Sequence, residues 1–127
     1  MRLLLDTQAL LWVLQDSNKL GSKARLEIAN AEVVYVSAAS ILEATIKSEL
    51  GKVKFPDNLV AEIGRSGFKP LEISLEHARG ITQAVLPHRD PVDRLLLSQA
   101  HYEQLAFVTA DEFILAAYGV GCVDARI

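Results

Sequence analysis

Four acidic residues stand at positions from which carboxylates could do chemistry together: Asp6, Glu43, Asp93 and Asp111. Asp6 and Asp111 each follow a short apolar run typical of a buried strand. Asp93 falls in the first turn of a predicted helix, and Glu43 lies about two turns beyond another strand. The strands of a parallel α/β sheet all end at the same edge, so these four side chains can converge there.

A cluster of four carboxylates would be unstable unless something compensated its charge. The acids would repel one another and take up protons, whereas a bound divalent cation reverses that effect. Mg²⁺ and Mn²⁺ prefer hard oxygen ligands and keep several waters, so a few carboxylates with open positions suit them. Such a centre can lower the pKa of a bound water and stabilise the attacking and leaving oxygens at a phosphodiester.

Most of these acids also have a structural explanation. Asp6 and Asp111 each precede a predicted helix, where aspartate is a good N-cap. Asp90 followed by Pro91 is a strong helix start, with proline at the first helical position. Asp93 then lies in the first turn, where an acid interacts favourably with the helix dipole. Asp90 is therefore more readily explained as a cap than Asp93.

Glu43 lies too deep in its predicted helix to be a cap. It could form an ion pair with Lys47 at i,i+4, worth only a few tenths of a kcal/mol. It also borders a predicted apolar stripe, where a glutamate whose only role is to interact with water would add little stability. The stripe consists of Ala39, Leu42, Ile46 and Leu50. Both interpretations of Glu43 are open at this point.

The elements that must position these acids alternate between strand and helix, which predicts an α/β fold with a mostly parallel sheet. The run Leu3–Leu5 has no polar alternation and predicts a strand buried on both faces. The further predicted strands are 33–36, 71–74, 107–109 and 120–123. The predicted helices are 7–14, a short one opened by Ser22, 38–50, 57–64, 75–85, 91–103 and 112–118.

Composition bounds the function classes. The chain has 127 residues, half of them hydrophobic, and a net charge of −3; this predicts one domain with a real core. No apolar run approaches the ~20 residues of a membrane span, and no signal peptide is visible, so a cytoplasmic protein is expected. The charge argues against a basic nucleic-acid coat protein.

A few other residues carry weaker signals. Cys122 is the only cysteine, which excludes an internal disulfide, and it is interpreted as a small core residue. His77 has no partner at metal-ligand spacing and is assigned no chemistry. Scattered basic side chains could contact a phosphate backbone, although such a scatter is more often a solvated face. They are Lys47, Lys52, Lys54, Arg65 and Lys69.

Four short motifs, taken in order, make the chain resemble PIN-domain ribonucleases, specifically the VapC-type toxins of bacterial VapBC toxin–antitoxin pairs. The motifs are Leu-Leu-Leu-Asp-Thr at 3–7, Val-Ser-Ala-Ala-Ser-Ile-Leu-Glu at 36–43, His-Arg-Asp-Pro-Val-Asp-Arg-Leu-Leu at 88–96 and Val-Thr-Ala-Asp at 108–111. The resemblance covers nearly the whole chain and implies a single PIN domain over residues 1–127. One departure is Gln8, where many members carry asparagine.

The resemblance implies a function as well as a fold. It implies a sheet of order 3-2-1-4-5, and Mg²⁺ or Mn²⁺ held by the acids at Asp6, Glu43, Asp93 and Asp111, with Thr7 and Thr109 as polar neighbours. The implied activity is hydrolysis of single-stranded or looped RNA by water attack. The implied partners are a second copy in a homodimer and a small cognate antitoxin that blocks the cleft.

Two other enzyme classes that use an aspartate after the first strand do not fit the neighbouring residues. A haloacid-dehalogenase-type phosphatase would need an aspartate at position 8, but this residue is Gln8. A phospho-receiver domain would need an aspartate after the third predicted strand, but that strand ends in Ser74. The remaining alternative is a PIN-like module that binds RNA or a partner without cutting. The presence of all four carboxylates favours the enzyme.

Overall fold

A computed structural model describes residues 1–83 and 90–127 of the chain. Five strands form one sheet in the order β3-β2-β1-β4-β5, and every neighbouring pair is parallel. The strands are β1 (Arg2–Leu5), β2 (Val33–Ser37), β3 (Lys69–Leu71), β4 (Ala106–Thr109) and β5 (Cys122–Asp124). The α/β class and the order 3-2-1-4-5 expected from the sequence are confirmed.

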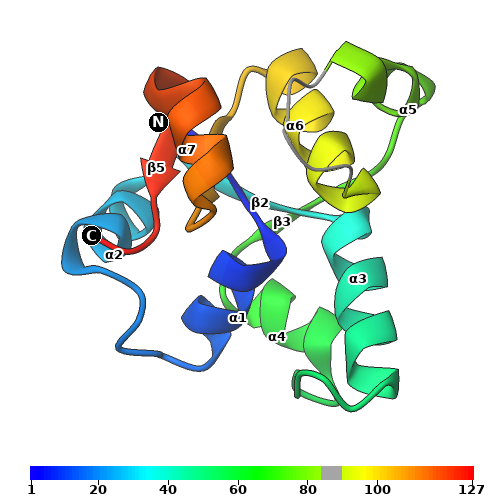
Figure 1. Ribbon diagram of the computed structural model, residues 1–127. Coiled ribbons are helices and arrows are strands. Elements are labelled where there is room, and N and C mark those ends of the chain that lie inside the picture. Colours follow the sequence, from blue (N-terminus) through cyan, green and yellow to red (C-terminus); the bar gives the residue numbers. More distant parts are fainter. Residues whose placement is uncertain (84–89) are drawn as a thin grey trace.

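Helices cover both faces of this sheet (Figure 1). They are α1 (Thr7–Leu14), α2 (Ser22–Asn30), α3 (Ala38–Glu49), α4 (Leu59–Arg65), α5 (Leu75–Arg79), α6 (Pro91–Glu103) and α7 (Glu112–Tyr118), with short 3₁₀ helices η1 (Gly80–Gln83) and η2 (Gly119–Gly121). Side chains of α1, α2 and α4 pack in one core cluster, and those of α6 and α7 in a second. In the described ranges, no helix is both long and apolar enough to cross a membrane.

The central strand β1 explains the apolar run at the start of the chain. Leu3 and Leu5 pack into the cluster with α1 and α2, whereas Leu4 packs into the cluster with α6 and α7. All three leucines are fully buried. A strand covered on both faces cannot alternate with polar residues, so an unbroken apolar run is what this position requires.

The edge strands are where the sequence-based bounds were wrong. Strand β3 is Lys69–Leu71 rather than 71–74, because pairing with β2 ends there and Ser74 is already the N-cap of α5. Strand β5 is Cys122–Asp124 rather than 120–123, because η2 intervenes.

Two of the predicted helices also differ in their bounds by more than one residue. The helix expected at 57–64 begins at Leu59, after the N-cap Asn58, and continues to Arg65. The helix expected at 75–85 ends at Arg79 and continues as η1; positions 84 and 85 lie outside the described residues.

The apolar stripe predicted on α3 is not a core stripe. Leu42, Ile46 and Leu50 are 58%, 50% and 62% exposed, and only Ala39 of the stripe is buried. The buried side of α3 carries small residues instead, Ser40 and Ala44. Helix α3 therefore approaches α1 closely, and Glu43 lies beside this small-residue side.

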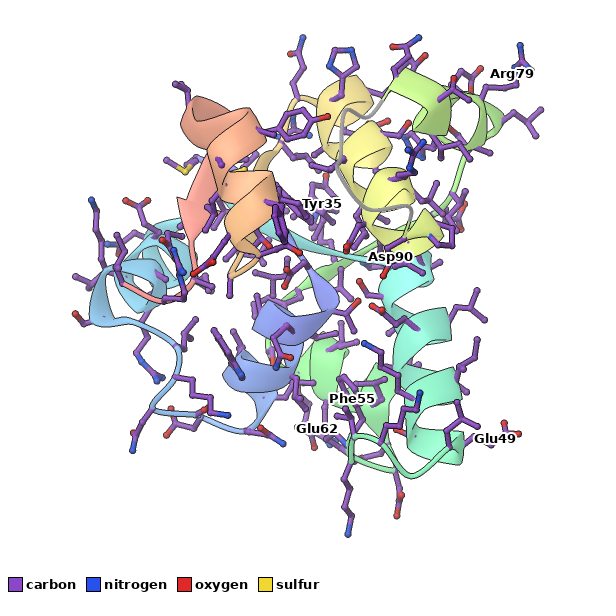
Figure 2. All side chains as sticks on the ribbon, viewed as in Figure 1. Tyr35, Glu49, Phe55, Glu62, Arg79 and Asp90 are labelled. Carbon is purple, nitrogen blue, oxygen red and sulfur yellow. The ribbon has the colours of Figure 1, made fainter. Side chains whose placement is uncertain are left out.

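The segment between α3 and α4 is anchored by one aromatic ring. Phe55 is buried and packs with Leu11 of α1 and Ala44 of α3, and Figure 2 shows it between these two helices. Because both helices contact the same ring, Phe55 anchors this segment against α1 and α3.

Helices α3 and α6 are joined by a buried polar contact. The Ser37 hydroxyl donates to Gln99 Oε1 and accepts from the backbone N–H of Ala39, which makes Ser37 the N-cap of α3. The Gln99 amide nitrogen donates to the Glu72 carbonyl. Gln99 and Ser37 are fully buried, so this contact fixes the separation of the two helices that carry Glu43 and Asp93.

Replacing Ser37 with alanine is expected to destabilise the protein by about 2 kcal/mol, because it removes a helix cap and leaves the buried Gln99 oxygen without its donor. Urea unfolding, followed by circular dichroism at unchanged m-value, measures this loss. The matched control is Ser48→Ala on the exposed side of α3, for which we expect a change within about 0.5 kcal/mol. Equal effects of the two substitutions would contradict the conclusion that Ser37 helps to fix the separation of α3 and α6.

Candidate functional site

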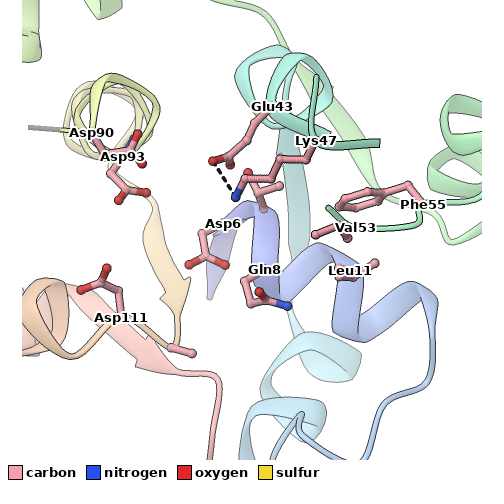
Figure 3. Close-up of a pocket in the computed structure, with 12 residues that line it drawn as sticks. Asp6, Gln8, Leu11, Glu43, Lys47, Val53, Phe55, Asp90, Asp93 and Asp111 are labelled. Carbon is pink, nitrogen blue, oxygen red and sulfur yellow. Dashed lines mark hydrogen bonds and ion pairs between the residues drawn. The ribbon is translucent and has the colours of Figure 1, made fainter. Parts of the chain in front are cut away.

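One pocket of about 310 Å³ collects all four acids expected from the sequence. It opens at the edge of the sheet where β1 and β4 end, and Figure 3 shows the acids around it. Its lining residues are Asp6, Thr7, Gln8, Leu11, Glu43, Lys47, Val53, Phe55, Asp90, Asp93, Ala110 and Asp111. The acids therefore meet in space although nearly the whole chain separates the first from the last.

Asp6 is the most buried of these carboxylates, with a relative exposure of 7%. Its backbone N–H donates to the Val108 carbonyl of β4 at 3.0 Å, which continues the pairing of the sheet by one residue. Its side chain is the N-cap of α1, with Oδ1 accepting from the backbone N–H of Ala9 at 2.7 Å. The cap explains how Asp6 is oriented, and the pocket gives it a second possible role.

The surroundings of Asp6 disfavour its negative charge. Burial, chiefly, raises the pKa of this carboxyl to about 6, and the charges of Glu43 and Asp111 raise it further. Hydrogen bonds from the Thr109 side chain and the Ala9 backbone act in the opposite direction. An aspartate that is costly to ionise without a counter-charge, in a pocket with further acids, is typical of functional sites.

Helix α6 brings Asp90 and Asp93 to the pocket, and the structure assigns them different local roles. Asp90 is the N-cap, with Oδ1 accepting from the backbone N–H groups of Val92 at 2.9 Å and Asp93 at 3.2 Å. Asp93 lies in the first helical turn and is half-buried. Figure 2 shows Asp90 at the end of α6 that faces α3. The cap predicted at Asp90 is thus present, and both carboxylates line the pocket.

Asp111 reaches the pocket from the loop after β4. Its Oδ1 caps α7 by accepting from the backbone N–H groups of Phe113 and Ile114, and its own N–H donates to the Thr109 hydroxyl oxygen at 3.0 Å. Thr109 is fully buried and also hydrogen bonds with Asp6. This threonine therefore ties together two of the acids.

Glu43 faces the pocket from α3 and is paired with Lys47. The Lys47 Nζ lies 3.2 Å from Glu43 Oε2; the glutamate side chain is 15% exposed and the lysine side chain 44%. Nearby, the hydroxyl of buried Thr7 donates to Ser40 Oγ at 3.1 Å and ties α1 to α3. Glu43 therefore forms the ion pair expected from the sequence and also lines the pocket.

The donors suit a hard divalent cation in chemical type, since Mg²⁺ and Mn²⁺ take carboxylate oxygens and waters. Burial chiefly, together with the charges of Glu43 and Asp111, raises the pKa of Asp6, and a cation bound beside it would favour its charged form. These carboxylates are, however, farther apart than the ligands of a bound metal ion. Within residues 1–83 and 90–127, no three acidic, histidine or cysteine side chains lie close enough together to hold a metal ion. The pocket as described is an open acidic site, with Glu43 paired to a lysine.

The apolar wall of the pocket was not found from the sequence. Val53 and Phe55 lie in a stretch with little pattern, and only the packing of Phe55 between two helices brings them there.

Two other residues discussed from the sequence lie outside the pocket. His77 is buried, with Nδ1 accepting from the Ser74 N–H and Nε2 2.9 Å from Glu103 Oε2. Cys122 is half-buried against the core, and burial raises the pKa of its thiol to about 11.

Comparison with known proteins yields a family and a fold. The sequence model of the PIN domain family matches residues 3–119. Similar solved structures include a toxin–antitoxin complex from Klebsiella pneumoniae, at 16% identity, TM-score 0.65 and 97% coverage of each chain. VapBC2 from Rickettsia felis bound to a promoter DNA fragment aligns at 13% identity, TM-score 0.68 and 98% coverage of each chain.

A further similar structure is FitAcB from Neisseria gonorrhoeae, at 16% identity, TM-score 0.63 and 98% coverage of each chain. A comparison with curated protein sequences finds no match. At these identities the solved structures establish the fold. The family model spans most of the sequence, and on that ground the chain belongs to the PIN domain family.

Proposed function

We propose that this protein is a metal-dependent endoribonuclease that acts in the cytoplasm as the toxin of a type II toxin–antitoxin pair. The observation that carries the proposal is the meeting of Asp6, Glu43, Asp93 and Asp111 in one pocket at the sheet edge. Four separate elements supply them, and the caps at Asp6 and Asp111 explain neither why they meet nor why Glu43 joins them. Membership of the PIN domain family supports the nuclease class.

The toxin role and the partners rest on the similar structures. The structure from Klebsiella pneumoniae is described as a toxin–antitoxin complex, and VapBC2 from Rickettsia felis is described as bound to a promoter DNA fragment. We propose by analogy a small cognate antitoxin that covers the pocket, a homodimer of this chain, and RNA as the substrate. A net charge of −3 is compatible with an enzyme that concentrates its acids in the pocket.

In the proposed reaction, water attacks a phosphorus atom of the RNA backbone, one P–O bond forms, and the bond to the leaving oxygen breaks. Asp6, Glu43 and Asp93 would hold Mg²⁺ or Mn²⁺, and Asp111 would complete the site or orient the attacking water. The bound ion would lower the pKa of water and offset negative charge on the phosphate. Thr109 keeps Asp6 and Asp111 in position through its hydrogen bonds.

Purified protein is expected to cleave total RNA with Mg²⁺ or Mn²⁺ and to stop when EDTA removes the metal. Gel analysis of labelled RNA measures cleavage, and calorimetric titration with Mn²⁺ measures binding separately. Cleavage that persists in EDTA would contradict the metal-dependent mechanism. Absence of both cleavage and metal binding would leave the acids as helix caps and favour the alternative, a PIN-like module that binds RNA or a partner without cutting.

A further inference from the structure

Lys47 is the one basic side chain among the described residues that line the acidic pocket. Figure 3 shows it extending from α3 with its ammonium group beside Glu43 and directed toward the space above Asp6. The 3.2 Å contact engages Glu43 Oε2, one of the two oxygens that Glu43 could offer a divalent cation. The ammonium group of Lys47 therefore already provides one positive charge among the carboxylates.

From this geometry we infer that Lys47 competes with the divalent cation for Glu43 and, once displaced, binds a phosphate of the RNA backbone. The inference rests on the proposed function, because it assigns Lys47 a role in the same pocket. In the metal-free protein, Lys47 offsets part of the carboxylate charge. With metal bound, the ammonium group is released next to the position of the substrate.

The chemistry of the pair suits such an exchange. An ion pair with a partly exposed lysine is worth at most about 1 kcal/mol, so a divalent cation can displace it. Lysine is a point charge on a flexible four-carbon stem, which lets its ammonium group move while α3 stays fixed. A free ammonium at the edge of an acidic pocket then gives a polyanionic substrate a favourable contact.

Two ion pairs elsewhere on the surface look different. The pairs Arg65–Glu62 and Arg25–Asp16 join exposed side chains away from the pocket. In the Lys47 pair, by contrast, the carboxylate is mostly buried and both side chains line the site. Stabilisation of α3 alone does not require the pair to face the other acids.

The first test measures metal binding without activity. Lys47→Met keeps most of the length of the side chain but removes its charge, and we expect the Kd for Mn²⁺, measured by calorimetry, to fall about fivefold because the competitor is gone. The matched control is Lys23→Met on α2, which changes the net charge equally but lies outside the pocket. Its Kd should stay at the wild-type value.

The second test measures RNA binding on the same proteins. The probe is a fluorescent single-stranded RNA with phosphorothioate linkages, which keep the backbone charge, and binding is followed by anisotropy in Mn²⁺. We expect Lys47→Met to weaken RNA binding about fivefold and to reduce the slope of log K against log salt by about 0.7, as for one lost phosphate contact. Lys47→Arg, which keeps the charge, should restore both values.

The opposite directions of the two effects are diagnostic, because general loss of structure would weaken both kinds of binding. Unchanged Mn²⁺ affinity in Lys47→Met, or equal effects in Lys23→Met, would overturn the competition. An unchanged salt slope would overturn the phosphate contact. If wild type binds Mn²⁺ and cleaves RNA while Lys47→Met behaves like wild type, this inference fails and the proposed function stands. If neither protein binds metal, both fail.

Discussion

Asp6→Asn is expected to reduce metal-dependent RNA cleavage by about 10³-fold or more, because it removes a charged oxygen ligand at the centre of the proposed site. The substitution keeps the side chain's size and its ability to cap α1, since asparagine is as good an N-cap as aspartate. The contact to the Ala9 N–H can therefore persist. Initial rates on labelled RNA in Mg²⁺ and in Mn²⁺ measure the loss.

The same substitution is expected to stabilise the metal-free protein at neutral pH. The folded pKa of Asp6, about 6, lies above its ordinary value of 3.8, so between these values the native state holds a proton that the unfolded chain has lost. The contribution of protonated Asp6 to the free energy of unfolding is therefore complete below pH 4 and is lost as the pH rises through 6. Above pH 6 this loss amounts to about 3 kcal/mol.

Urea unfolding in EDTA from pH 4 to pH 8 measures this effect. Wild type should lose stability across the interval, whereas Asp6→Asn should lose markedly less and be the more stable protein at pH 7. Lower cleavage together with higher stability cannot come from misfolding. A variant that is inactive and also less stable at pH 7 would instead make Asp6 a structural cap.

Asp93→Asn is expected to lower cleavage about 100-fold, whereas Asp90→Asn should stay within about threefold of wild type. Asp90 accepts the hydrogen bonds that start α6, and asparagine can accept them as well. Asp93 is in the first helical turn with its carboxylate in the pocket, where the proposed metal needs charge. Cleavage assays and Mn²⁺ calorimetry on the two variants measure the difference.

These two variants control for each other, because each changes one carboxylate to an amide at the same end of α6. If Asp90→Asn abolished cleavage and Asp93→Asn did not, the assignment of the metal ligand would be reversed. If both kept full activity, α6 would contribute no essential acid. Thermal unfolding in EDTA checks that both proteins remain folded.

The sequence alone determined the central elements and the identity of the acids. The run Leu3–Leu5 predicted a strand covered on both faces, and Asp90–Pro91 predicted the start of a helix; both are found where they were predicted. Both elements can be predicted from local sequence, namely from an unbroken apolar run and from the fixed φ of proline. The order of the sheet followed from the resemblance of four motifs rather than from any pattern within them.

The tertiary structure decided the elements and contacts that depend on neighbours. The bounds of β3 and β5 are set by pairing with β2 and β4, which no local pattern encodes. The stripe with Leu42 and Ile46 is exposed, because α3 presents its small residues to α1 instead. Periodicity shows that a helix has an apolar side, but it does not show which side a neighbouring helix covers.

The character of the site was likewise decided in three dimensions. The sequence could not say whether Glu43 pairs with Lys47 or faces the acids, and the structure shows that it does both. The raised pKa of Asp6 is caused by burial and by charges from α3 and the loop after β4, segments far from it in the chain. Residue types follow from the sequence, whereas burial and the distances between charges exist only once the sheet and its helices are assembled, and these set the electrostatics of the pocket.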